Sequence, residues 1–135
     1  MIQKRVEVSP GDSSGESWCI ATFLPLRRWR DVIPFLRMSA RVEKQLKQTP
    51  GLVRYGLRAD LLHKRFWTFS VWPDKGSVNA LVKSEPHATA MRYMSDWAGE
   101  GAAFVEWNSS NGSIKWKDAM ERLQQPSFYY RSSAG

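Results

Sequence analysis

The chain of 135 residues has one cysteine, Cys19, and two histidines, His63 and His87. A single thiol excludes an internal disulfide framework and a cysteine-based zinc site. Cys19 stands in an apolar run with Ile20 and Ala21, which predicts a buried, inert thiol and fits a reducing cytoplasmic setting. Phosphate-binding glycine loops, serine elbows and nucleotide fingerprints are also missing from the sequence, so it carries no motif of those enzyme classes.

Long hydrophobic runs are missing as well. The longest stretch without a charge runs from Ser17 to Leu26, about half of what a membrane-spanning helix needs. The N-terminal residues contain no apolar core of signal-peptide length. We therefore expect a soluble, cytoplasmic protein without a membrane partner. The length predicts one domain over residues 18–125, with a flexible N-terminal segment (1–17) and a C-terminal tail (126–135).

Tryptophan and positive charge are abundant by contrast. Seven tryptophans in an aromatic share of 13% predict a wide core, an oligomer interface or an aromatic-lined pocket. The net charge of +7 is compatible with anionic partners. However, the basic residues are spread out and no nucleic-acid motif accompanies them, so we interpret them as a solvated surface and consider a nucleic-acid partner unfavoured.

Hydrophobic periodicity predicts alternating strands and helices. Strands are predicted at 18–24, 52–59, 65–72 and 102–108, and helices at 31–48, at 77–83 and from Pro86 to about Asp96. Asp31 is the predicted N-cap of the first helix, and Pro34 falls in its first turn, where its missing N–H costs nothing. A strand-like piece at 114–116 and a short helix at 118–124 complete the prediction.

The order β-α-β-β-α-β predicts an α+β, ferredoxin-like fold, a four-stranded antiparallel sheet with helices on one face. The strand at 65–72 is apolar on both faces, with Phe66 and Trp72 on one and Trp67, Phe69 and Val71 on the other. A strand of this kind needs a cover on both sides. We therefore expect the bare face to pair with a second copy, giving a homodimer with a closed α+β barrel.

Three segments resemble a known superfamily: residues 49–57 (TPGLVRYGL), residues 65–72 (RFWTFSVW), and residues 84–87 (SEPH) followed by Met91. They are similar to the dimeric α+β-barrel proteins, which include antibiotic-biosynthesis monooxygenases and haem-degrading monooxygenases, and most of all to spheroidene-monooxygenase-like proteins. The resemblance covers about residues 18–108. It implies the ferredoxin-like fold and an oxidoreductase of monooxygenase type.

His87 is the candidate catalytic residue. Helical spacing places it with Ala90, Met91 and Met94 on one apolar stripe that faces the sheet. Two interpretations stay open for such a histidine: a satisfied core side chain, or a proton-handling group or axial haem ligand. In haem-degrading members of the superfamily a histidine of the corresponding helix faces the cleft, which is what the resemblance adds. His63, in a hairpin connection, is interpreted as a solvated loop residue.

The other candidates are ligand-binding residues. Arg54 and Arg58 share one strand face across Gly56 and could clamp a carboxylate, or could be surface arginines. The remaining candidates could line a cavity for a flat or polyene ligand, or could be packing residues: they are Trp67, Trp72, Met91, Tyr93 and Trp107.

Two functions follow from these residues. The first is a monooxygenase that acts on a small apolar or aromatic compound, in which the substrate itself supplies electrons to oxygen, as some superfamily members do. The second is a non-catalytic dimer that binds haem or another hydrophobic ligand. The sequence leaves the cofactor open between none, flavin and haem, and it predicts no metal site apart from His87 if haem is bound.

Overall fold

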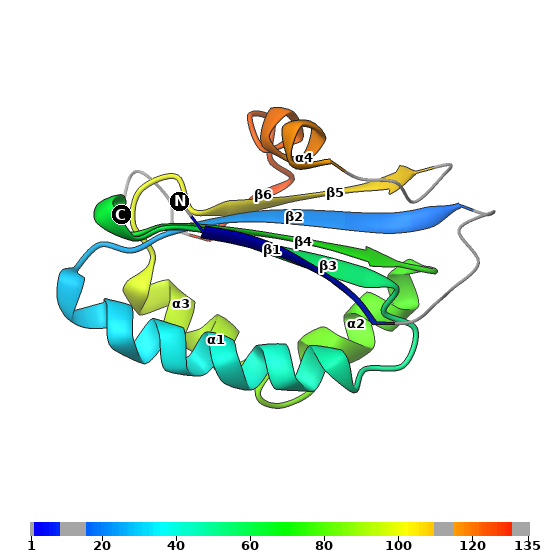
Figure 1. Ribbon diagram of the computed structural model, residues 1–135, viewed down its shortest axis with the longest axis horizontal. Coiled ribbons are helices and arrows are strands. Elements are labelled where there is room, and N and C mark those ends of the chain that lie inside the picture. Colours follow the sequence, from blue (N-terminus) through cyan, green and yellow to red (C-terminus); the bar gives the residue numbers. More distant parts are fainter. Residues whose placement is uncertain (1, 9–15, 110–114, 131–135) are drawn as a thin grey trace.

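Strands of the chain form one antiparallel sheet in the order β1-β3-β4-β2-β5-β6 in the computed structural model, which describes residues 2–8, 16–109 and 115–130 (Figure 1). The strands are β1 (Ile2–Glu7), β2 (Ser17–Pro25), β3 (Arg54–Asp60), β4 (Arg65–Trp72), β5 (Ala103–Ser109) and β6 (Phe128–Tyr129). β2 and β4 lie at the centre, where both neighbours satisfy their backbone hydrogen bonds. The predicted α+β, ferredoxin-like class is confirmed.

The sheet has six strands, so the expectation of four is wrong. β1 lies in the segment for which we expected no element, and β6 lies in the expected tail. β1 pairs with β3, and Val6 and Val8 pack beside Trp72 and Leu52. β1 is an edge strand, and edge strands often carry charged side chains that protect them from pairing with other chains. These charges interrupt the alternating hydrophobic pattern by which a strand is predicted from sequence.

Three helices cover one face of the sheet: α1 (Val32–Lys47), α2 (Lys75–Lys83) and α3 (His87–Trp97) (Figure 1). We call this side the cavity face. α1 turns Phe35, Met38 and Val42 toward the sheet, as its spacing predicts. Asp31 stands at the N-cap position, but its carboxylate accepts a hydrogen bond from Arg28 Nε (2.8 Å) and does not cap the helix.

A fourth helix, α4 (Trp116–Arg122), lies on the opposite side, which we call the α4 face (Figure 1). Helices therefore cover both faces, not one. Ala119 of α4 is fully buried over Cys19, and the Trp116 ring meets Phe69 edge-on at 4.8 Å. α4 thus covers part of the face that we expected a second copy to cover. Trp116, expected in a strand-like piece, begins this helix; Ile114 lies outside the described residues.

Two short 3₁₀ turns connect these elements at one end of the sheet: η1 (Trp29–Asp31), before α1, and η2 (Leu61–His63), between β3 and β4. Lys64 closes the second turn with a left-handed backbone (φ 55°), a conformation that costs a non-glycine residue about 1–2 kcal/mol. None of the helices in the described part of the chain is long and apolar enough to cross a membrane.

Gly56 has no room for a side chain. A Cβ built on it would lie 2.2 Å from the ring of Phe69, which is itself buried against α4. The Phe69 ring therefore fills the space beside Gly56 in the row of Arg54 and Arg58. This close approach fixes β3 against β4.

Replacing Gly56 by alanine therefore tests the packing of the sheet. We expect Gly56→Ala to lower the free energy of unfolding by about 1–3 kcal/mol, because Phe69 must leave its site. Gly99→Ala is the matched control, since its new methyl group would meet neighbours no closer than 3.4 Å. Urea denaturation measures both variants. Equal midpoints for the two would contradict this packing.

Candidate functional site

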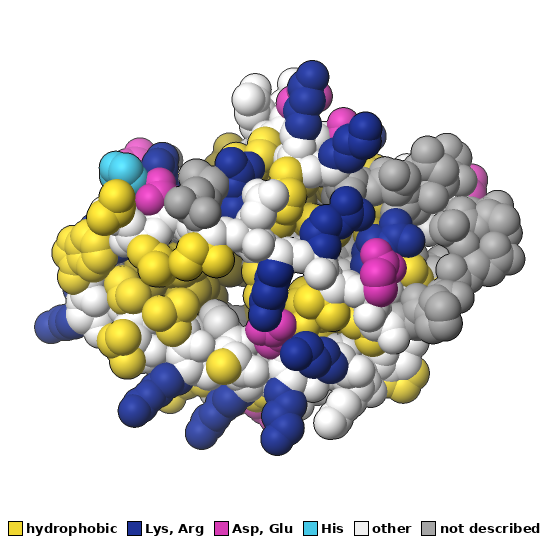
Figure 2. All heavy atoms as spheres, viewed as in Figure 1, with side chains coloured by type: hydrophobic (Ala, Val, Ile, Leu, Met, Phe, Trp, Pro, Cys, Tyr) yellow, Lys and Arg dark blue, Asp and Glu magenta, His cyan; other side chains and the backbone are white. Residues whose placement is uncertain are grey.

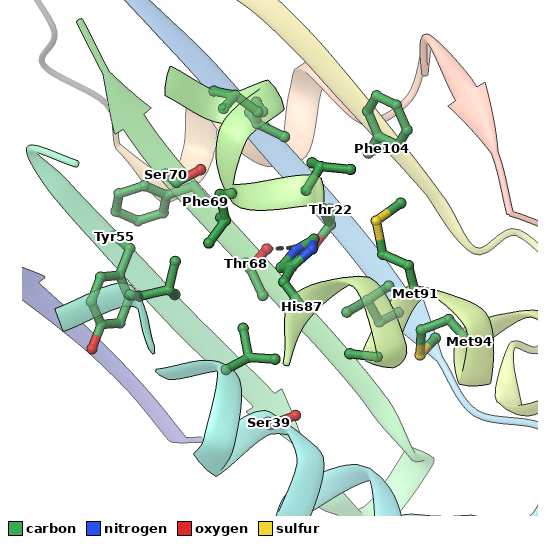
Figure 3. Close-up of a pocket in the computed structure, with 18 of the residues that line it drawn as sticks. Thr22, Ser39, Tyr55, Thr68, Phe69, Ser70, His87, Met91, Met94 and Phe104 are labelled. Carbon is green, nitrogen blue, oxygen red and sulfur yellow. Dashed lines mark hydrogen bonds between the residues drawn. The ribbon is translucent and has the colours of Figure 1, made fainter. Parts of the chain in front are cut away.

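A cavity of about 400 Å³ lies between the cavity face of the sheet and helices α1, α2 and α3 (Figure 3). Every other residue of β2 and β4 points into it, because side chains alternate along a strand. Its wall is mainly apolar, which suits an apolar ligand of modest size. The lining residues used below are Thr22, Phe35, Met38, Glu43, Tyr55, Thr68, Trp72, Lys75, His87, Met91, Met94, Trp97, Phe104, Glu106 and Tyr130.

His87 is the first residue of α3, and its ring points into the cavity (Figure 3). Its backbone N–H donates to Gln45 Oε1 of α1 at 3.1 Å, which fixes the start of α3 against α1. Its ring Nδ1 is buried and has no hydrogen-bond partner among the described atoms. Burial lowers the pKa of His87 below its ordinary value, because the low-dielectric surroundings disfavour the imidazolium. At neutral pH the ring is therefore neutral and able to accept a proton.

Two threonines provide hydroxyl groups on the floor of the cavity. Thr22 of β2 and Thr68 of β4 stand directly opposite each other, and their hydroxyls form a hydrogen bond (Figure 3). Met91 and Met94 of α3 lie across the cavity from Tyr55 (Figure 3). Their flexible thioether side chains can adapt to ligands of irregular shape. The cavity thus combines an apolar wall with a few fixed polar groups.

A carboxylate anchors one border of the cavity. Glu43 of α1 accepts a hydrogen bond from Tyr55 Oη (2.7 Å) and forms an ion pair with Lys4 Nζ (2.5 Å). Burial opposes the charge on Glu43, but the hydrogen bonds from Lys4 and Tyr55 outweigh it, and the pKa of this carboxyl lies below its ordinary value. Burial, together with the hydrogen bond to Glu43, raises the pKa of Tyr55. β1, β3 and α1 are joined at this point.

A second carboxylate, Glu106 of β5, lies at another border. It accepts a hydrogen bond from Trp18 Nε1 (3.3 Å) and pairs with Lys75 Nζ (3.5 Å). Lys75 also stands 5.5 Å from the centre of the Trp18 ring, a separation at which a cation is attracted to an aromatic face. Tyr130 lines the cavity too, and burial raises the pKa of its hydroxyl to about 12.

The structure places the predicted site residues in three different locations. His87, Trp72 and Met91 line the cavity. Tyr93 stands on the outer side of α3, where it is 48% exposed. The remaining four lie on the α4 face, so the sheet separates them from His87: they are Arg54, Arg58, Trp67 and Trp107.

Arginine and tryptophan pack against one another on the α4 face. The guanidinium of Arg58 lies 5.8 Å from the centre of the Trp67 ring and 6.0 Å from that of Trp116. Arg122 of α4 lies 4.6 Å from the centre of the Trp107 ring. These are stacking distances for cation–π pairs. The arrangement gives Trp67 and Trp107 a packing role in the described chain.

Several cavity residues were missed by sequence reasoning. Thr22, Thr68 and Glu43 are common surface residue types, and nothing local marks them. Strand alternation could have found the first two, because each shares a face with an apolar neighbour two positions away. Glu43 could be found only from the pairing of β1 with β3, which brings Lys4 to it across the chain.

Haem does not fit this cavity well. His87 Nδ1 would be a suitable axial ligand, since it is buried and unpartnered. The two propionates of haem would need cations, but Lys75 is the one lysine or arginine among the described lining residues, and Glu106 already pairs with it. Arg54 and Arg58, the predicted carboxylate clamp, are across the sheet. Among described residues, no group of three metal-ligating side chains gathers either.

No family model matches this chain, and no curated protein matches it. Solved structures do match. A conserved protein from Methanosarcina mazei Go1 is 14% identical, with a TM-score of 0.62 over 70% of this chain and 94% of that one. A putative antibiotic biosynthesis monooxygenase from Nitrosomonas europaea is also 14% identical, with a TM-score of 0.62 over 70% and 91%.

A variant of SnoaB, a cofactor-independent oxygenase from Streptomyces nogalater, is similar over 74% of this chain and 96% of its own, with 14% identity and a TM-score of 0.52. At these identities the likeness is one of fold. The chain thus has the ferredoxin-like α+β fold of antibiotic-biosynthesis monooxygenase structures, and the suspected resemblance to them is confirmed at the level of the fold.

The buried state of His87 predicts a pH dependence of stability. Its pKa is lowered in the folded chain, so the unfolded chain binds more protons near and below pH 6.5. The contribution of neutral His87 to the free energy of unfolding is fully present above that pH. It is lost as the pH falls through the pKa that His87 has in the folded chain. We expect thermal unfolding between pH 7 and pH 5 to show this loss in the wild type and a smaller loss in His87→Leu. Equal pH dependence in the wild type and in His87→Leu would contradict a buried, neutral His87.

Proposed function

We propose that this chain is a monooxygenase-type oxidoreductase that oxidises a small apolar or aromatic compound in the cavity between sheet and helices. The observation that carries the proposal is His87, a buried, neutral imidazole that lines a mainly apolar cavity and whose Nδ1 has no hydrogen-bond partner in the described part of the chain. The fold of the antibiotic-biosynthesis monooxygenase structures supports the reaction class. The likeness to SnoaB supports a reaction in which the substrate supplies the electrons.

The role of His87 is that of a general base and then a general acid. It accepts a proton from an acidic CH₂ group of an aromatic substrate, such as the ring CH₂ of the keto tautomer of a quinol. The resulting anion transfers one electron to O₂, and the substrate radical and superoxide combine to form a C–O bond. Protonated His87 returns the proton to the peroxide, which then loses water. A CH₂ group becomes C=O, one oxygen atom leaves as water, and the substrate supplies all four electrons.

The rest of the cavity orients the substrate and keeps water out. The apolar wall, which includes Trp72, Met91 and Met94, favours a flat aromatic or polyene ligand over water. The paired hydroxyls of Thr22 and Thr68 offer a hydrogen bond to one oxygen of the substrate. The finer likeness to spheroidene-monooxygenase-like proteins makes polyenes the second substrate class that we propose to test.

Replacing His87 tests the proposed reaction. We expect His87→Ala to lower kcat/KM for O₂ consumption with a quinol substrate by about a hundredfold to ten-thousandfold, because the proton acceptor is lost. The wild-type rate should rise with pH to a plateau, with its midpoint below 6.5, since the lowered pKa of His87 keeps the base neutral above that pH.

Other titratable groups also line the cavity, so the pH profile needs a comparison: they are Glu43, Tyr55, Lys75, Glu106 and Tyr130. The acid limb should disappear from the residual rate of His87→Ala and persist in His63→Gln. Ligand binding in thermal-shift assays with no O₂ consumption by the wild type would overturn the proposal and favour the non-catalytic ligand binder.

The homodimer stays a proposal, and the structure changes where we place its interface. α4 already covers Cys19, Phe69 and Val105, so a second copy would pack beside α4 rather than over the whole α4 face. The arginines stacked on Trp67 would border such an interface. We expect a dimer in sedimentation velocity at micromolar concentration. A monomer there would refute the predicted barrel and leave the cavity, which lies within one chain, unaffected.

A further inference from the structure

Exposed hydrophobic side chains gather at one end of this molecule. β1, β4, β5 and β6 begin or lie there, and β2 and β3 end there, because the strands are antiparallel and paired in register. The exposed large hydrophobic residues used below are Trp29, Ile33, Leu36, Leu61, Leu62 and Tyr93. We call the surface of η1, η2 and the first two turns of α1 the apolar end. Figure 2 shows hydrophobic side chains collected at the end where α1 begins.

The apolar end is continuous across the elements that form it. The Leu26 N–H donates to Lys64 C=O at 2.9 Å, which joins the segment before η1 to the end of η2. Lys64 Nζ then stands 4.9 Å from the centre of the Trp29 ring. Leu62 is 83% exposed, Ile33 61% and Trp29 60%. An exposed cluster of this kind is unusual for a surface that faces only water.

Positive charge continues from the apolar end along the outer side of α1. Four exposed cations follow Leu36 on that helix: Arg37, Arg41, Lys44 and Lys47. Three acids lie near these cations, and each of them is paired. Glu43 binds Lys4 and Tyr55 and lies 3.9 Å from Lys47, and Asp31 is buried and paired with Arg28. Glu85 is exposed in the groove that Arg41 and Lys44 line, and it pairs with Arg92 at 3.6 Å. Lys and Arg side chains line the α1 edge of the molecule in Figure 2.

We propose that the apolar end and the outer side of α1 dock on the surface of an anionic lipid bilayer. Hydrophobic side chains at the start of a helix, followed by cations that outnumber the acids beside them, complement the acyl–headgroup boundary of anionic lipids. A second copy placed on this surface by two-fold symmetry would set the α1 cations against their own copies. Charge complementarity therefore favours lipid over self-association. A peripheral contact needs no membrane-spanning helix, and it revises our expectation that the protein has no membrane partner.

The docking surface is next to the cavity. Tyr93 stacks on Trp97 with ring centres 5.1 Å apart, and Trp97 both lines the cavity and contacts Phe35 of α1. An apolar compound dissolved in the bilayer would thus meet the cavity through this aromatic border. The docking proposal goes beyond the proposed reaction and does not rest on it.

Vesicle flotation tests the proposal with the full chain. We expect it to float with vesicles of phosphatidylcholine and phosphatidylglycerol, and not with phosphatidylcholine alone or in high salt. Arg37→Glu combined with Arg41→Glu should weaken binding by at least about fivefold for each cation removed. The matched control is Lys115→Glu with Lys117→Glu, two exposed cations at the start of α4, which makes the same change in net charge and should bind as the wild type.

The apolar part has its own variant, Ile33→Gln with Leu62→Gln, which should weaken vesicle binding by about tenfold or more. Circular dichroism and thermal unfolding verify that each variant folds. The proposal would be overturned if the wild type did not float, or if the α1 and α4 charge variants were weakened equally. It would also be overturned if the glutamine variant changed the sedimenting mass of the protein but not its flotation, because the apolar end would then bind a second copy and not lipid. Vesicle binding is measured without any substrate, so a failure of the docking proposal can be distinguished from a failure of the proposed reaction.

Discussion

The structure depends on a central pair of strands that is apolar on both faces. β2 and β4 alternate between two sets of side chains, so one set must be covered by helices α1 to α3 and the other by something else. α4 supplies part of that second cover within the same chain. Once both faces are covered, the cavity face is free to hold an unfilled apolar space rather than a closed core.

That space gives His87 its chemical character. In water an imidazole exchanges hydrogen bonds with the solvent, but at the start of α3 its Nδ1 is buried and has no hydrogen-bond partner among the described residues. A buried polar atom without a partner costs free energy, and a site can retain such an atom when a ligand supplies the missing partner. The proposed base and the proposed apolar substrate therefore follow from one feature, the mainly apolar cavity between sheet and helices.

Sequence patterns predicted the inner elements well. β4 has the bounds expected for it, and α1 turns its predicted apolar face to the sheet, because strong periodicity reports burial directly. The edges were missed for the opposite reason: the charged residues of β1 and the brevity of β6 leave no such signal. His87, Trp72 and Met91 were placed correctly in the cavity. Arg54, Arg58, Trp67 and Trp107 were grouped with them although alternation along β4 puts Trp67 and Trp72 on opposite faces. Alternation separates the two faces of a sheet, but it does not say which face holds the cavity.

The central claim, that an apolar ligand enters the cavity face and not the α4 face, can be tested most directly with methyl-labelled methionine. Met38, Met91 and Met94 line the cavity, and Met120 belongs to α4 on the other side of the sheet. Titration with a small aromatic compound such as naphthol, followed by NMR, should shift the methyl signals of the first three and leave that of Met120 unchanged. Shifts at Met120 alone, or at none of the four, would contradict a ligand cavity between the sheet and helices α1, α2 and α3.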